Sequence, residues 1–151
     1  MAIISKTYGR LLAILMAWLG YSCDIFTTAD EYGTPTATFK AIGTVISQAD
    51  DVPIEGIRAV MKTEKGAVWY GIDTVYTDSK GVFNLKSRIF DFNKLYVELT
   101  DVDGEKNGSF IDKEIEADYS NEKFTGGDKH WYRGEAEKDL GILKLTPKEW
   151  T

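Results

Sequence analysis

The sequence predicts an all-β protein, an antiparallel β-sandwich of about seven strands. From Phe39 onward the chain is rich in β-branched and aromatic residues, which gather in short runs. Turn-forming residues separate these runs at intervals of about 8–15 residues, a spacing typical of strands joined by short connections. After the apolar run near the N-terminus, no stretch shows the helical repeat over a useful length.

Each expected strand follows from its own residues. Residues 95–99 alternate apolar and polar side chains, which suits a strand with one buried face. Between two strands, Asp78 can accept backbone N–H bonds and Gly81 can adopt a positive φ, which predicts a tight turn. Gly56 predicts a bulge where the alternation breaks. We expect strands near 38–47, 55–62, 67–77, 82–87, 94–101, 110–117 and 139–146.

Composition narrows the possible classes of function. A chain of 151 residues with 43% hydrophobic residues suits one folded domain. Its 24 acidic and 18 basic residues give a net charge of -6, which argues against a nucleic-acid partner. A single cysteine excludes an intrachain disulfide and any cysteine-rich zinc or iron–sulfur site.

The N-terminus has the pattern of an export signal. Lys6 and Arg10 precede an uncharged, mostly apolar run over 11–21, and Ser22 and Cys23 follow it. This order predicts a helical secretory signal peptide over residues 1–22, because the run is shorter than the ~20 apolar residues of a bilayer span. The alternatives are a membrane-anchoring helix, or a plain secretory signal with an incidental cysteine.

The position of the cysteine favours lipidation. The segment 19–23 resembles the lipobox of bacterial lipoproteins, in which a cysteine receives acyl chains and becomes the first residue after cleavage. Leu19 lies four positions before Cys23 rather than three, and Tyr21 stands where a small residue is usual. We therefore expect a signal peptide at 1–22, a flexible polar tether at 23–37, and the β-sandwich domain at 38–151.

Three motifs carry a resemblance to a known domain family. They are the Gly-x-Val strand at 43–45, the Pro-Ile-x-Gly-Ile turn that begins at Pro53, and Thr-Asp-x-x-Gly-x-Phe at 77–83. In this order they resemble the carboxypeptidase regulatory-like, transthyretin-like sandwich over roughly residues 38–100. The resemblance implies an immunoglobulin-like β-sandwich in which Phe83 enters the core just past the turn.

The layout of the whole chain resembles a second, narrower family. The lipobox, the sandwich motifs and the segments 32–35, 101–104 and 131–132 are similar to the radical SAM-associated lipoproteins of Bacteroidetes-type bacteria. That name describes neighbouring genes, so the resemblance implies no enzyme and no established substrate. It does suggest that the chain is a substrate or accessory of a modifying enzyme encoded nearby.

The acidic loop at 101–112 is the candidate binding site. Calcium prefers six to eight oxygen ligands on a bendable loop, and this loop has oxygen-bearing side chains at alternate positions. It is not an EF-hand, because Lys106 stands where that loop requires glycine and strands flank it on both sides. The alternative is a solvated connection whose side chains cap turns. The candidate calcium ligands are Asp101, Asp103, Glu105, Asn107 and Asp112.

No catalytic constellation is recognisable, so we expect no enzyme activity and no cofactor other than possible calcium. The single histidine, His130, predicts only a loop or strand-end side chain. The favoured function is a lipid-anchored lipoprotein of the bacterial cell envelope, on its periplasmic or outer-membrane face. Its partners would be the membrane, through the acyl anchor, and an unknown protein or glycan. The alternative is a calcium- or glycan-binding module, in which exposed aromatic residues could hold a sugar: Trp69, Tyr70, Tyr76, Trp131 and Tyr132.

Overall fold

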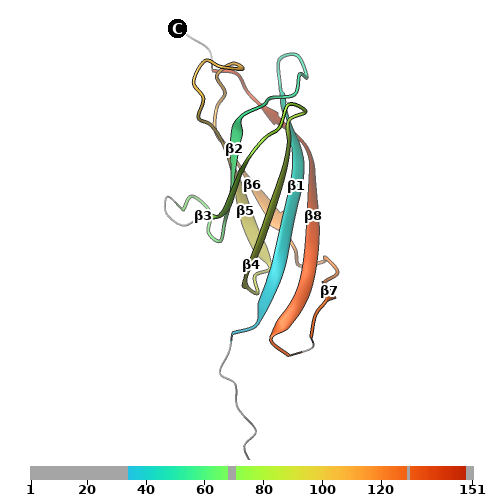
Figure 1. The fold of residues 1–151 in the computed structure, drawn as a ribbon. Helices are drawn as coiled ribbons and strands as arrows, with labels where there is room; N and C mark the ends of the chain where they lie inside the picture. Colours follow the sequence, from blue (N-terminus) through green and yellow to red (C-terminus); the bar gives the residue numbers. More distant parts are fainter. Residues whose placement is uncertain (1–33, 68–70, 129, 149–151) are drawn as a thin grey trace, which may run out of the picture. The chain divides into compact units, whose positions relative to one another are not determined.

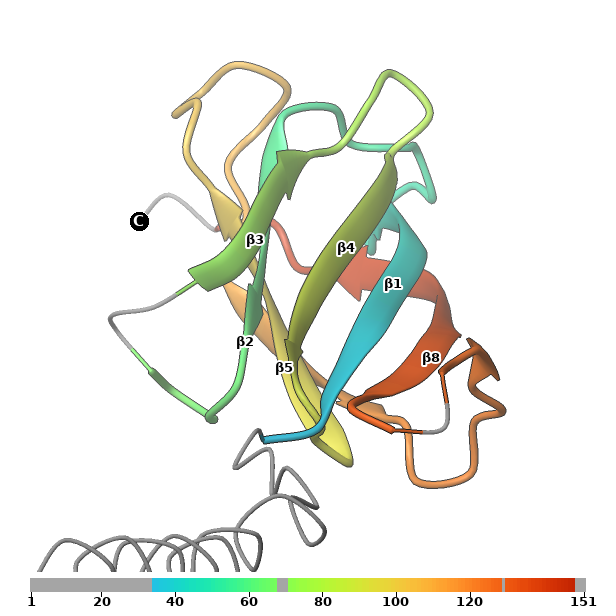
Figure 2. The same cartoon turned by 60° about the horizontal axis from the view of Figure 1, so that its bottom comes forward.

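The computed structural model describes residues 34–67, 71–128 and 130–148. These residues form two four-stranded sheets, with strand orders β4-β1-β8-β7 and β3-β2-β5-β6. Figure 1 shows the strands, and Figure 2 shows β4, β1 and β8 side by side. The strands are β1 (Thr36–Ser47), β2 (Ile57–Lys62), β3 (Gly71–Tyr76), β4 (Val82–Phe90), β5 (Lys94–Asp101), β6 (Lys113–Asp118), β7 (Thr125–Gly126) and β8 (Tyr132–Leu145).

The predicted all-β sandwich is confirmed, with one correction to its topology. Five of the six strand pairings are antiparallel, but β1 and β8 run parallel from Thr36↔Tyr132 to Ser47↔Leu145. After β5 and β6 in the other sheet, the chain returns as β7 and then β8, and β8 lies beside β1 in the same direction. No local sequence pattern encodes such a long-range pairing. The signal helix expected at 1–22 lies outside the described residues.

The predicted strand positions hold, with differences at their ends. The last strand begins at Tyr132 rather than at 139, and the two-residue strand β7 was not expected. The bulge expected at Gly56 is absent from β2, since Gly56 (φ 84°) lies in the turn before that strand. A Cβ atom at Gly56 would lie 2.8 Å from an Asp103 carboxylate oxygen, so the glycine there permits the acidic loop to approach.

The core lies between the two sheets. Phe39 makes edge contacts with the rings of Tyr119 and Phe124, at centroid distances of 4.9 and 5.7 Å. The Tyr119 hydroxyl donates to the Lys40 carbonyl at 2.7 Å, so this buried phenol is satisfied. Phe83 is 2% exposed, which confirms its predicted place in the core.

The turn between β3 and β4 follows the prediction closely. Asp78 accepts hydrogen bonds from the backbone N–H groups of Lys80 and Val82, both at 2.9 Å. Gly81 has φ 72°, and a Cβ atom there would lie 2.2 Å from the Val45 carbonyl oxygen. Glycine is therefore required here for two reasons: it adopts the positive φ without strain, and it leaves room for the backbone of β1.

The strand register defines two ends of the sandwich. β1 begins beside the end of β4 and the start of β8, since Thr36 pairs with both Phe90 and Tyr132. We call this end the base; it contains residues 34–36, 90–94, 118–124, 127–128 and 130–133. We call the opposite end the tip; it contains the connections 47–56, 77–81 and 101–112 together with 146–148 (Figure 1).

Candidate functional site

Cys23, the predicted lipidation site, lies outside the described residues. Its modification therefore stays a prediction. Within the residues that the structure describes, no helix is long and apolar enough to cross a membrane.

The acidic loop at the tip is held in shape by its first carboxylate. Asp101 accepts the backbone N–H of Phe110 at 2.8 Å and that of Asp103 at 3.4 Å. These bonds close the loop on itself and hold Phe110, which is 5% exposed, against the core. Asp101 therefore performs the capping role of an aspartate in a turn.

A second pair of side chains ties the loop to the residues before β2. Asp103 accepts a hydrogen bond from the Asn107 amide at 3.2 Å, and the same amide donates to the Glu55 carbonyl at 3.3 Å. Asn107 has φ 63°, a left-handed conformation that asparagine tolerates better than most residues. The structure thus brings together two of the five predicted calcium ligands.

Among the described residues, the side chains of the other three, Asp101, Glu105 and Asp112, form no hydrogen bond with the side chains of this pair. Glu105 and Asp112 are exposed, and Asp112 lies beside a separate hollow. Across residues 34–67, 71–128 and 130–148, no three His, Cys, Asp or Glu side chains gather in a way that could hold a metal ion. Calcium binding stays a prediction.

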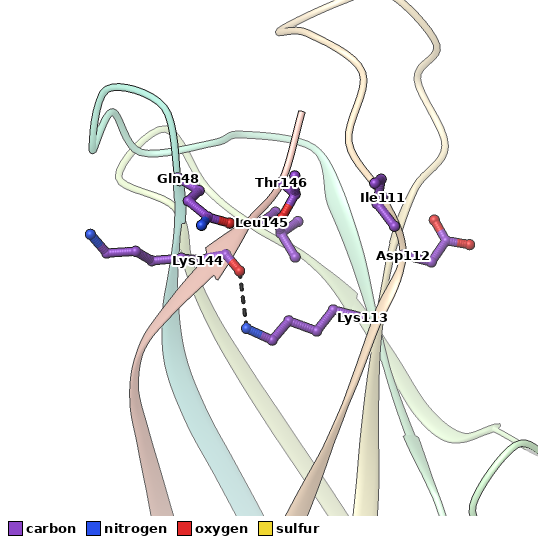
Figure 3. Close-up of a pocket in the computed structure, with 7 residues that line it drawn as sticks. All are labelled: Gln48, Ile111, Asp112, Lys113, Lys144, Leu145 and Thr146. Carbon is purple, nitrogen blue, oxygen red and sulfur yellow. Dashed lines mark hydrogen bonds between the residues drawn. The ribbon is translucent and has the colours of Figure 1, made fainter. Parts of the chain in front are cut away.

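The hollow beside Asp112 has a volume of about 330 Å³ and lies between β6 and β8 (Figure 3). Its polar groups are largely engaged with one another. The Lys113 ammonium donates to the Lys144 carbonyl at 3.0 Å, and the Thr146 hydroxyl donates to the Gln48 amide oxygen at 2.7 Å. The full lining is Gln48, Ile111, Asp112, Lys113, Lys144, Leu145 and Thr146.

A polar hollow of about 490 Å³ opens at the base. Arg133 forms an ion pair with Asp91 at 2.9 Å and lies over the Phe124 ring, 3.8 Å from its centroid. His130, the only histidine in the chain, is exposed at this hollow and lies just before β8, as the sequence predicted. The lining is Pro35, Asp91, Phe124, Gly127, His130, Tyr132 and Arg133.

An apolar hollow of about 500 Å³ also reaches the base, where the edge strands β3 and β4 meet. Phe90, at the end of β4, is 58% exposed at this hollow. At its rim the Arg88 guanidinium lies 4.3 Å from the centroid of the Tyr132 ring and donates to the Thr36 hydroxyl at 3.3 Å. The lining is Thr36, Thr63, Ile72, Arg88, Ile89, Phe90 and Phe92.

Sequence reasoning missed these three hollows. Each hollow is lined by segments that are distant in the sequence, so no local motif predicts it. The aromatic platform proposed for sugars is not assembled by its described members, because Tyr76 ends β3 at the tip while Tyr132 begins β8 at the base. Trp69 and Tyr70 lie outside the described residues.

Asp118, Asp128 and Glu135, three carboxylates at or near the base, have pKa values below the ordinary range, and Ser120 is the main cause for Asp118. Lys40 and then Lys86 lower the pKa of Glu135, because both ammonium groups pair with this carboxylate on the outer face of the sheet. The N–H groups of Tyr132 and then His130 lower the pKa of Asp128 by donating to its carboxylate, each at 2.9 Å. All three effects favour the charged form.

No protein-family model matches the chain, and no curated protein matches it. Among solved structures, it is similar to BcpA, the major pilin subunit of Bacillus cereus, with 14% identity and a TM-score of 0.44 over 76% of this chain and 31% of the pilin. It is also similar to GBS52, a minor pilin of Streptococcus agalactiae, with 8% identity and a TM-score of 0.42 over 78% of this chain and 47% of that one. A dioxygenase domain from Streptomyces sp. SirexAA-E matches with 13% identity and a TM-score of 0.37, over 79% of this chain and 85% of that domain. The chain spans about a third of the length of BcpA, and these likenesses assign it no activity, substrate or partner.

Proposed function

We propose that this protein is a lipid-anchored lipoprotein of the bacterial cell envelope whose β-sandwich is a non-catalytic structural or interaction module. The observation that carries the proposal is the position of the only cysteine. Cys23 follows a cationic segment and a short apolar run, and precedes a polar stretch and the sandwich. Acyl chains on that thiol would hold the protein on a membrane, at ~0.8 kcal/mol per buried methylene.

The described part of the domain supports an interaction role over catalysis. In the hollow at the tip, Lys113 and Thr146 donate to neighbouring oxygens, and Lys144 pairs with Asp51 at 2.6 Å. In the polar hollow at the base, Arg133 and Asp91 pair with each other. A general acid, base or nucleophile needs a side chain that is free to reach a substrate, and these side chains are engaged in the fold. His130 is exposed at the base hollow, but no serine or cysteine nucleophile among the described residues lines that hollow beside it.

The proposed anchor would be joined to one particular end of the domain. The polypeptide enters the sandwich at the base, where the Thr36 N–H donates to the Trp131 carbonyl at 2.7 Å. The tip lies at the far end of β1, a strand of 12 residues that extends about 36 Å. The connections of the tip would therefore be presented away from the bilayer, where a protein or glycan partner could reach them.

Metabolic labelling with a fatty-acid analogue tests the anchor. Wild type should incorporate the label, and Cys23→Ala should lose it, because the thiol is the proposed attachment atom. Ser22→Ala is the matched control and should keep the label, since a small residue is retained before the cysteine. A label that persists in Cys23→Ala, or wild-type protein that partitions into the aqueous phase of a detergent split, would contradict the proposal.

A further inference from the structure

An exposed phenylalanine marks the base of the sandwich. Phe90 is 58% exposed although it ends a strand whose inner residues are buried. It lies with Ile72, Ile89 and Phe92 around the apolar hollow of about 500 Å³. A large apolar side chain left in water beside an apolar hollow is typical of a surface that meets another apolar phase.

The hollow lies directly beside the point where the chain enters the sandwich. The backbone N–H of Asp91 donates to the Pro35 carbonyl at 3.0 Å, and Thr36 itself lines the hollow. Cys23 precedes Thr34 by 11 positions (34 − 23), which span at most about 40 Å when fully extended. An acyl anchor on Cys23 would thus hold the entry point, and Phe90 beside it, within about 40 Å of a bilayer, while Ile142, paired with Thr44, lies farther along the sandwich toward the tip.

The charges at the base permit such an approach although the chain as a whole is acidic. In the base, Asp91 is paired with Arg133 at 2.9 Å, and Lys94 is paired with Glu116 of β6 at 2.6 Å, while Asp118 and Asp128 accept backbone N–H groups and form no ion pair among the described residues. Among the described residues, Arg88 takes part in no ion pair, and its guanidinium donates to the hydroxyl of Thr36. A guanidinium at the rim of an apolar hollow can donate to a lipid phosphate while the neighbouring side chains enter the interface.

We infer that the base of the sandwich docks end-on against the headgroup layer of the bilayer that carries the anchor. Phe90 and Phe92 enter the interface and Arg88 faces the lipid phosphates. This inference rests on the proposed function and adds to it an orientation and a contact surface. The tip, with its acidic loop, then faces away from the membrane.

An environment-sensitive dye on an engineered cysteine tests this contact. The full-length protein is reconstituted in vesicles of phosphatidylethanolamine and phosphatidylglycerol, and Phe90→Cys and Ile142→Cys variants are labelled with a thiol-reactive dye. Ile142 is the matched control, because it is an apolar side chain that is 67% exposed but lies toward the tip. Thermal unfolding of both variants checks that the sandwich is intact.

We expect the dye at position 90 to emit at shorter wavelength than the dye at position 142, and to be quenched by spin-labelled lipid while the other is not. Equal quenching at both positions, or at neither, would overturn the docking. No quenching at position 90 is also the result expected if a protein partner, rather than the bilayer, covers this surface. The parent protein separates the two proposals. Without an engineered cysteine, its only thiol is that of Cys23, so a protein acylated at Cys23 takes up no dye. One dye per molecule would contradict the anchor, and with it the docking that rests on the anchor.

Discussion

The tip and the base of the sandwich use their polar side chains in different ways. At the tip, the side-chain oxygens of Thr77, Asp78 and Asp101 bond to backbone groups of neighbouring turns. At the base, Asp118 and Asp128 also accept backbone N–H groups, but the other charged side chains bond mostly to one another or lie over rings, as Arg133 does with Asp91 and Phe124. The first arrangement fixes the path of the backbone, and the second leaves an adaptable surface.

This difference changes how the acidic residues of the tip are interpreted. In the sequence, the loop at 101–112 is the richest source of metal-ligand oxygens. In the folded chain, Asp101 and Asp103 accept hydrogen bonds that shape the loop. A dense run of Asp, Asn and Gly therefore has a structural explanation at the tip, whereas the exposed Phe90 at the base has none within the fold.

The largest effect is expected from Gly81→Ala at the tip. The added Cβ would lie 2.2 Å from the Val45 carbonyl oxygen, and the residue has φ 72°. The clash and the left-handed conformation together should cost more than about 4 kcal/mol in the free energy of unfolding. Gly104→Ala is the control: its φ is 74° but nothing lies within 4 Å, so it should cost only about 1–2 kcal/mol in denaturant unfolding. Equal losses in the two variants would show that β1 does not approach the turn so closely.

A smaller loss is expected from Thr77→Val. The Thr77 hydroxyl donates to the Ile54 carbonyl at 2.7 Å and accepts the Ile57 N–H at 2.9 Å, and the residue is 3% exposed. Removing it leaves two buried backbone groups unpaired, so stability should fall by about 3 kcal/mol and Tm by about 10 °C. Thr77→Ser, which keeps the hydroxyl, should recover most of the loss in calorimetry. If Thr77→Val were as stable as wild type, the two hydrogen bonds of the hydroxyl would not contribute to the stability of the fold.

Asp101→Ala should cost less again, about 1–2 kcal/mol, because the loop that it closes is largely exposed. The same variant sharpens the calcium hypothesis when Tm is measured with and without millimolar calcium. If the loop binds calcium, wild type should gain Tm by mass action and Asp101→Ala should not. A wild-type Tm that calcium leaves unchanged would leave the carboxylates with their capping role alone.

The sequence indicated the strands whose inner and outer faces differ in polarity. Residues 95–99 alternate in both composition and burial, and β5 was predicted with its observed bounds. The first half of β8 gave no such signal, because its outward side chains are charged and its inward Gly134 and Ala136 are small. The Glu135 carboxylate pairs there with Lys40 from β1 and Lys86 from β4, and no local pattern reveals these pairs.

The candidate sites were harder to predict than the strands. An aspartate followed by glycine suits both a metal ligand and a turn cap, and only the folded loop shows that Asp101 accepts the Phe110 N–H. The apolar hollow needs Ile72 from β3 and Phe90 from β4 to meet across the two sheets. Such a surface depends on sheet packing, which the sequence specifies only through the whole fold.

The smallest expected effect is a change of stability with pH, which tests the hydrogen bonds and ion pairs of two carboxylates near the base. The pKa values of Asp128 and Glu135 are lowered in the folded protein, so protonation favours the unfolded chain. Their contribution is complete above the unfolded values near pH 4 and is lost as pH falls through the lower folded values. Asp128→Asn and Glu135→Gln should therefore be less stable than wild type at pH 7, and the difference should shrink at about pH 2–3 in urea unfolding. Glu105→Gln in the loop at the tip is the control, because Glu105 is exposed and its side chain forms no ion pair or hydrogen bond among the described residues, and its stability should follow wild type at both pH values. A difference that stays constant from pH 7 to the acid range would mean that these carboxylates stabilise the base by their shape rather than by their charge.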